Sequence, residues 1–120
     1  MSKENNHDQP IDLDFLNSII GNDNQFEKEL YLIYIESAKS NIEKLYRSII
    51  EDDNNAWYMA SHAFKGASAA IGAFKLSKVL ELAQKNPKEN RDKKNKILSN
   101  IKDEYQLVDD FITQRLEHLK

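Results

Sequence analysis

The stretch WYMASHAFKGASAAIG, residues 57–72, separates into two faces when it is wound into a helix. One face collects apolar side chains spaced three or four residues apart, namely Trp57, Ala60, Phe64, Ala67 and Ile71. Such spacing predicts an amphipathic helix, running from about Ala56 towards Ile71, whose apolar face packs in a core. His62 lies on the opposite face, which is expected to meet solvent.

Apolar residues also repeat at helical spacing on both sides of this stretch. Steps of three and four run through residues 31–49 and again through 97–119, and shorter apolar segments lie at 13–20 and 76–83. Only 3 glycines and 2 prolines occur in 120 residues, which favours long uninterrupted helices over short strands. The sequence therefore predicts an all-α fold, an antiparallel up-down four-helix bundle with a short N-terminal helix packed across one end.

Polar residues of the kinds that cap helices precede the expected helices. The candidates are Asp12 or Asp14, Asn22 or Asp23, and the acidic turn at residues 51–55. The helix through 76–83 is expected to end near Asn86, because Pro87 disfavours helical geometry in the residue before it. Asn86, Pro87 and Glu89 also match an N-cap, N1 and N3 pattern, so the last helix is expected to begin close to Pro87.

Length and composition limit the classes of function that the chain can have. Its 120 residues fit one domain, expected at residues 11–120 after a disordered tail at 1–10, with no room for a second catalytic domain. Cysteine is absent, which excludes disulfides, thiolate zinc sites and cysteine nucleophiles. The first ten residues are polar and no stretch approaches about 18 apolar residues, so a cytoplasmic protein with no membrane partner is expected.

Charge argues against nucleic acid as a partner. The chain carries 17 basic and 20 acidic residues, so no excess of positive charge is available to follow a phosphate backbone. Basic residues do cluster in the segment 85–96. Runs of this kind usually lie in solvent, and we interpret this one as a solvated loop and helix start without a binding role.

The face of the central helix that carries His62 combines a nucleophile with small neighbours. Tyr58 and Met59 lie one turn before the histidine, Lys65 and Gly66 one turn after it, and Ala69 two turns after it. Imidazole is mainly neutral at cytoplasmic pH and is then nucleophilic. The small side chains leave room for a partner to bring a concave pocket up to the ring. Tyr58 and Met59 are candidates for the apolar part of a docking face.

Two of these neighbours admit two interpretations each. A glycine inside a helix costs about 1 kcal/mol relative to alanine, so Gly66 is expected to serve either steric clearance beside His62 or close helix packing. The wheel favours clearance, because position 66 lies away from the apolar face. Lys65 is either an ordinary solvated lysine or a cation placed to meet a phosphoryl group, whose charge spreads over three oxygens during transfer.

The segment SHAFKGASAAIG, residues 61–72, resembles the phosphoacceptor helix of histidine-containing phosphotransfer (HPt) domains. The pattern of that family is H-x-x-K-G followed by small residues, with a glycine ten positions after the histidine. The residues that fall on it are His62, Lys65, Gly66, Ser68 and Gly72. The segment IDLDFL, residues 11–16, is similar to the opening helix of the family, so the resemblance covers nearly the whole chain. Phe64 replaces the usual leucine on the core face.

The resemblance implies a role for each matched residue. His62 is the phosphoacceptor, Lys65 stabilises the phosphoryl group, and Gly66 keeps the approach open; with Ala69, Tyr58 and Met59, Gly66 forms the docking face. Gly72 ends the helix. Ser68 lies about 120° from His62 on the wheel, so we expect it to make a local hydrogen bond rather than to act as a second acceptor. The implied partners are the receiver domains of a hybrid sensor histidine kinase and of a response regulator, and the receiver supplies the Mg²⁺. The chain itself needs no cofactor or metal and is expected to be a monomer.

Other readings of the sequence stay open. No glycine-rich nucleotide loop is present, so a phosphocarrier without kinase activity is favoured over an enzyme that uses ATP. A bundle that binds receivers or a histidine kinase as an adaptor or inhibitor, without phosphate turnover, is the alternative. A purely structural bundle leaves Gly66 unexplained. His7 and His118 lack metal-ligand spacing and are not expected to hold a metal.

Overall fold

The computed structural model describes residues 9–119, and these residues form five α-helices and no strand. The helices are α1 (Leu13–Ile20), α2 (Asn24–Ile50), α3 (Asn54–Ala70), α4 (Phe74–Lys85) and α5 (Arg91–His118). The prediction of an all-α protein is confirmed. Most of the tail expected at residues 1–10 lies outside the described residues. No helix in the described part of the chain has the length and apolar character needed to cross a bilayer.

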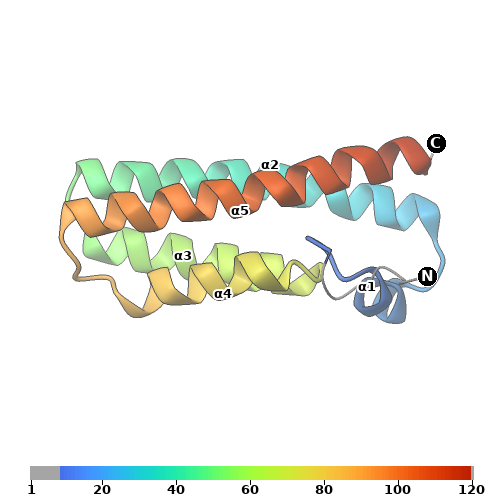
Figure 1. Cartoon of the computed structure of the whole chain (residues 1–120), viewed down its shortest axis with the longest axis horizontal. Helices are drawn as coiled ribbons and strands as arrows, with labels where there is room; N and C mark the ends of the chain where they lie inside the picture. Colours follow the sequence, from blue (N-terminus) through green and yellow to red (C-terminus); the bar gives the residue numbers. More distant parts are fainter. Residues whose placement is uncertain (1–8, 120) are drawn as a thin grey trace, which may run out of the picture.

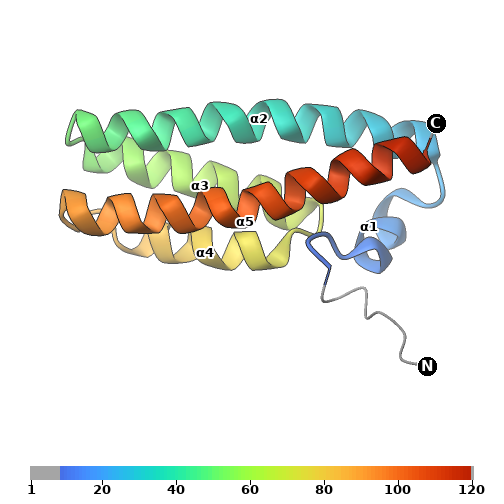
Figure 2. The ribbon, with the colours of Figure 1, turned by 45° about the horizontal axis from the view of Figure 1, so that its top comes forward.

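The four longer helices lie side by side and α1 lies at one end of them (Figures 1 and 2). α2 contacts α3 and α5, and α4 also contacts α3 and α5, so the contacts close a ring around a shared core. The described molecule measures 45 × 31 × 21 Å along its principal axes. α2 extends past the end of α3, and α1 lies near this extension (Figure 1).

Side-chain caps fix where four of the helices begin. Asp12, Asp23, Asp53 and Asn90 have extended backbone conformations, and each side chain accepts a hydrogen bond from the backbone N–H three residues later. The predicted caps are therefore resolved in favour of Asp12 and Asp23. The third helix is confirmed and begins slightly earlier than expected, at Asn54.

The prediction that the last helix begins close to Pro87 is wrong. α5 begins at Arg91, capped by Asn90, whose side chain accepts from Lys93 N at 2.8 Å. Asn86 is engaged in ending α4 instead. Its Nδ2 donates to the backbone oxygen of Leu82 at 2.8 Å, so the amide serves the carboxyl end of one helix rather than the amino end of the next.

The core forms around the apolar face of α3. Trp57 and Phe64 are fully buried, as predicted, whereas Ala67 is only half-buried. Trp57 Nε1 donates to the backbone oxygen of Ala83 at 2.8 Å, which fixes α3 against α4. Phe64 lies against Tyr34 of α2 and Tyr105 of α5, with ring centroids 6.4 and 6.2 Å away. The helix that carries His62 is thus packed against α2, α4 and α5.

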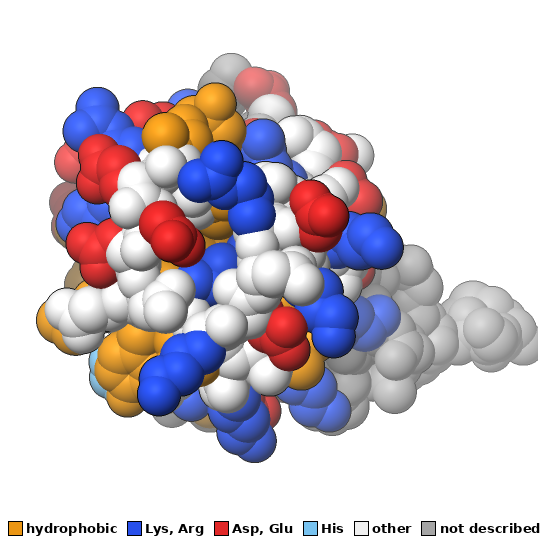
Figure 3. Space-filling view, turned by 90° about the vertical axis from the view of Figure 1, so that its left-hand side faces the viewer, with side chains coloured by type: hydrophobic (Ala, Val, Ile, Leu, Met, Phe, Trp, Pro, Cys, Tyr) orange, Lys and Arg blue, Asp and Glu red, His pale blue; other side chains and the backbone are white. Residues whose placement is uncertain are grey.

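The basic segment 85–96 is not uniformly solvated, so its interpretation needs one correction. Lys94 is buried, its Nζ donates to Asn54 Oδ1 at 2.7 Å, and it lies 5.3 Å from the centroid of the Trp57 ring. Burial lowers the pKa of Lys94, although Asp52 and Asp53 oppose the effect. Most other basic residues of this segment are exposed, and Figure 3 shows Lys and Arg interspersed with Asp and Glu at this end of the molecule.

Candidate functional site

His62 is exposed, on the side of α3 opposite the core. Trp57 and Phe64 are both 0% exposed and anchor the other side of the same helix. The orientation predicted from the wheel is therefore confirmed. Because α3 is held by its apolar face, the imidazole is presented on a rigid support while taking no part in the core.

The structure places the rings of Tyr58 and His62 next to each other. Their rings are nearly parallel, with an interplanar angle of 7° and centroids 6.0 Å apart. Tyr58 is 38% exposed and Met59 is 59% exposed, so both remain available to a partner. The expected docking residues on the N-terminal side of His62 thus lie at the surface, and the ring of one of them is stacked beside the histidine.

Gly66 lies in open space one turn after His62. A Cβ built at this position finds no atom within 4 Å beyond its chain neighbours and the helix's own backbone. Close helix packing is therefore not the reason for this glycine, and that interpretation is excluded. Lys65 and Ala69 are half-buried, and Ser77 Oγ of α4 donates a long hydrogen bond of 3.4 Å to the backbone oxygen of Lys65.

Ser68 is buried away from the exposed site, and the hydrogen bond that the structure shows for it joins two helices. It is fully buried, and its Oγ lies 2.8 Å from the hydroxyl oxygen of Tyr34 on α2. Position 68 turns about a third of a circle away from His62, which directs Ser68 towards α2. Burial raises the pKa of the Tyr34 phenol, so a neutral hydroxyl pair joins the two helices. The structural role expected for Ser68 is thus an interhelical one.

Gly72 ends the helix region as predicted and also makes a tertiary contact. Its φ is +85°, a conformation in which side chains other than glycine are strained. Its carbonyl oxygen accepts from Asp12 N at 2.9 Å, and a Cβ here meets Asp12 O at 3.0 Å. The corner after α3 therefore holds the segment that leads into α1.

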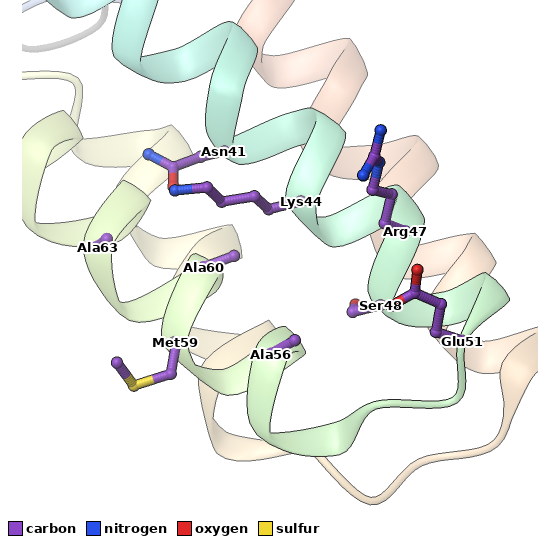
Figure 4. Close-up of a pocket in the computed structure, with 9 residues that line it drawn as sticks. All are labelled: Asn41, Lys44, Arg47, Ser48, Glu51, Ala56, Met59, Ala60 and Ala63. Carbon is purple, nitrogen blue, oxygen red and sulfur yellow. The ribbon is translucent and has the colours of Figure 1, made fainter.

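A groove of about 410 Å³ runs between α2 and α3 beside the His62 face. Its lining comes from both helices: Asn41, Lys44, Arg47, Ser48, Glu51, Ala56, Met59, Ala60 and Ala63. Figure 4 shows Lys44 extending from α2 along the groove, with its end beside Asn41. Met59 belongs both to this groove and to the expected docking face, so the two surfaces are continuous.

The α2 side of this surface was not predicted from the sequence. A signal was present, because Asn41 and Ser48 are polar residues at buried positions of α2. A polar side chain at a buried position of a helix is an informative departure from the apolar pattern. Lys44 and Arg47 place two cations along the groove, although Arg47 also pairs with Glu43 at 3.0 Å.

In residues 9–119 no group of three or more His, Cys, Asp or Glu side chains is arranged to hold a metal. His118 is exposed at the end of α5, and His7 lies outside the described residues. Comparisons with family models, curated proteins and solved structures give no match for this chain. Inference about function therefore rests on the residues themselves.

Proposed function

We propose that this protein is an HPt protein of a two-component phosphorelay, which carries a phosphoryl group on His62 between aspartate-bearing receiver domains in the cytoplasm. The observation that carries the proposal is the exposed His62 of an H-x-x-K-G sequence, one turn before a Gly66 with open space around it. The proposal includes the finer description of the fold, an antiparallel up-down four-helix bundle of α2 to α5 with α1 packed across one end.

The proposed step moves a phosphoryl group from the receiver's aspartate to the imidazole. The lone pair of one ring nitrogen forms the N–P bond as the aspartyl O–P bond breaks, and the bonding electrons leave with the carboxylate. The proton on the other ring nitrogen stays on the ring or passes to solvent. The reverse step discharges His62 onto the next receiver. The receiver contributes the acidic pocket and its Mg²⁺.

Lys65 is proposed to stabilise the transferred group. It lies one turn after His62 on the same side of α3 and is half-buried, so its stem is supported by the helix surface. Negative charge is spread over three oxygens in the loose transition state, and a nearby ammonium lowers the energy of that charge. The same cation favours the phosphorylated state at rest.

The receiver is proposed to dock over the surface around His62. Tyr58 and Met59 give it apolar contact area, while Gly66 and Ala69 leave the approach to the ring unobstructed. The groove between α2 and α3 continues this surface and adds the cations of Lys44 and Arg47. Cations at the rim of an interface speed association with a partner whose facing surface is acidic. The carrier acts as a monomer.

The decisive experiment offers the protein a receiver domain phosphorylated with acetyl phosphate and measures acid-labile phosphate on the protein. The wild type and His118→Gln are expected to become labelled, because His118 lies outside the site. His62→Gln is expected to remain unlabelled. No label on the wild type with several receivers, or label persisting in His62→Gln, contradicts the proposal.

The adaptor reading is the second candidate, and its supporting observation is the groove that extends the docking surface onto α2. An adaptor needs that surface and not the nucleophile. It therefore predicts that His62→Gln binds receivers with wild-type affinity. It also predicts that neither the wild type nor His62→Gln accepts phosphate. Titration calorimetry beside the labelling experiment separates the two functions.

A further inference from the structure

The ring of Tyr58 lies beside the proposed phosphoacceptor ring. The rings of Tyr58 and His62 are stacked at 7° with centroids 6.0 Å apart. Resting on the proposed function, we infer that Tyr58 is a positioning residue, which holds the His62 imidazole in the orientation used for phosphoryl transfer. This role is additional to any contact that Tyr58 makes with the receiver.

The helix itself explains why these two rings meet. Side chains of a helix point back towards its N-terminus, so the ring of His62 lies over the turn that carries residue 58. Residues four apart are neighbours on one face. Without an aromatic ring at position 58, an exposed histidine at this place exchanges among the side-chain rotamers that a helix allows. The stack with Tyr58 restricts this rotation although both rings remain near solvent.

A parallel stack restrains the ring without blocking its reactive atoms. The lone pair of an imidazole nitrogen lies in the plane of the ring, at its edge, whereas the Tyr58 ring lies nearly parallel to that plane and is offset from it, with its centroid 6.0 Å away. The edge stays open to an incoming phosphoryl group. A perpendicular contact places the edge of one ring against the other and blocks part of this approach. The 7° interplanar angle therefore fits a ring that restrains the imidazole without blocking access to its nitrogen atoms.

Orientation matters for this reaction because the attacking and leaving atoms lie in line with phosphorus. Holding a nucleophile in such an orientation removes part of the entropy loss from the barrier. Aromatic pairs at this separation favour one arrangement by roughly two- to tenfold. Loss of the stack is expected to slow the transfer step by the same factor.

The kinetic test uses single-turnover transfer from a phosphorylated receiver over a range of receiver concentrations. Tyr58→Leu keeps an apolar side chain but loses the ring, and its rate at saturating receiver is expected to fall about two- to tenfold. Tyr58→Phe restores the ring and is expected to restore the rate. Tyr46→Leu is the matched control, because Tyr46 is a half-exposed tyrosine of α2 outside the groove lining.

Each outcome of the kinetic test has one meaning. If Tyr58 acts only as a docking contact, Tyr58→Leu raises the half-saturating receiver concentration and leaves the saturating rate unchanged, which overturns the positioning role. A Tyr58→Phe variant as slow as Tyr58→Leu also overturns it. A wild type that accepts no phosphate overturns the proposed function and the positioning role with it.

A second measurement needs no phosphate at all. The ring current of Tyr58 is expected to shift the NMR signals of the His62 ring protons, and Tyr58→Leu is expected to remove that shift. The His118 signals in the same spectra serve as an internal reference, because His118 lies at the end of α5. His62 signals that are the same in the wild type and in Tyr58→Leu overturn the stack, whatever the transfer experiment gives.

Discussion

At Gly66, the residue that is best for the stability of α3 differs from the residue that is best for the proposed phosphoryl transfer. A glycine within a helix is less favourable than alanine by about 1 kcal/mol. Space is open around Gly66, so nothing opposes an added methyl group. We expect Gly66→Ala to raise the free energy of unfolding by roughly 0.5–1 kcal/mol and to slow phosphoryl transfer, because the methyl group lies on the docking face.

The fluorescence of Trp57, the single tryptophan, measures the first half of this prediction in urea denaturation. Transfer from a phosphorylated receiver measures the second. A larger side chain such as leucine at position 66 is expected to slow transfer further, by about tenfold or more, since a shift of about 1 Å at a reacting centre is already costly. A Gly66→Ala variant that is less stable than the wild type contradicts the open geometry described for this residue.

Gly72 behaves in the opposite way at the junction of α3, α4 and the segment before α1. Its φ of +85° and the 3.0 Å approach of Asp12 O to a built Cβ leave no unstrained place for a side chain. We expect Gly72→Ala to lower the free energy of unfolding by about 1–3 kcal/mol. Urea denaturation followed by Trp57 fluorescence measures this change in the free energy of unfolding. Equal stabilities for Gly72→Ala and the wild type contradict the prediction.

Two helices are joined by an ion pair that the hydrophobic pattern does not reveal. Glu27 of α2 is 2% exposed and accepts from Arg115 Nε of α5 at 2.7 Å and from Nη2 at 3.2 Å. The Tyr31 hydroxyl donates to the same carboxylate. Burial raises the pKa of Glu27, but the hydrogen bonds from Arg115 and Tyr31 outweigh it, and the pKa lies below its ordinary value of 4.5.

This lowered pKa predicts how stability depends on pH. The folded carboxyl stays ionised at pH values where the unfolded one binds a proton, so its contribution is fully present above pH 4.5. It is lost as the pH falls from there through the folded pKa. Glu27→Gln is expected to lower stability at neutral pH by about 2–4 kcal/mol and to flatten the fall in acid. Denaturation between pH 7 and pH 3, roughly, measures both.

The surface pair of Glu43 and Arg47 is the matched control for this experiment. It lies on the same helix, its side chains are 60% and 68% exposed, and its atoms are 3.0 Å apart. Glu43→Gln is expected to change stability by less than about 0.5 kcal/mol, because exposed ion pairs contribute little. If Glu27→Gln has no larger effect than Glu43→Gln, α2 and α5 are not held together by this pair.

At the scale of the whole molecule, periodic patterns predicted the helices because each apolar face has to be buried. The exposed side of α3 followed from the same pattern, which is why the orientation of His62 was predicted. The contacts between helices could not be predicted from these patterns. The partners of Ser68 and Lys94 lie 34 and 40 residues away in the chain, and a wheel drawn for one helix contains neither partner.

The same separation explains why the groove and the start of α5 were missed. The groove is lined by Asn41 and Lys44 of α2 together with small residues of α3, so it is a property of two helices together. The start of α5 was predicted wrongly because two helix ends compete for the side chain of Asn86. The Asn86 amide matched an N-cap in the sequence, but it donates to Leu82 in the preceding helix. Local patterns do not rank such competing partners.

The separation of core and chemistry across α3 predicts that the fold does not depend on the proposed phosphoacceptor. His62 is exposed and lies beside Tyr58 at the surface, whereas Phe64, two residues later, is fully buried. His62→Gln is expected to leave the free energy of unfolding within about 0.5 kcal/mol of the wild type. Phe64→Ala is expected to lower it by about 3–5 kcal/mol.

Thermal and urea denaturation of the two variants measure this contrast directly. The result matters for function, because an unlabelled His62→Gln protein is informative only if it is folded. A His62→Gln variant that unfolds as readily as Phe64→Ala assigns His62 a structural role and removes the basis for a site built on the free side of α3. A His62→Gln variant with wild-type stability and no acid-labile phosphate leaves the imidazole as the group that carries phosphate.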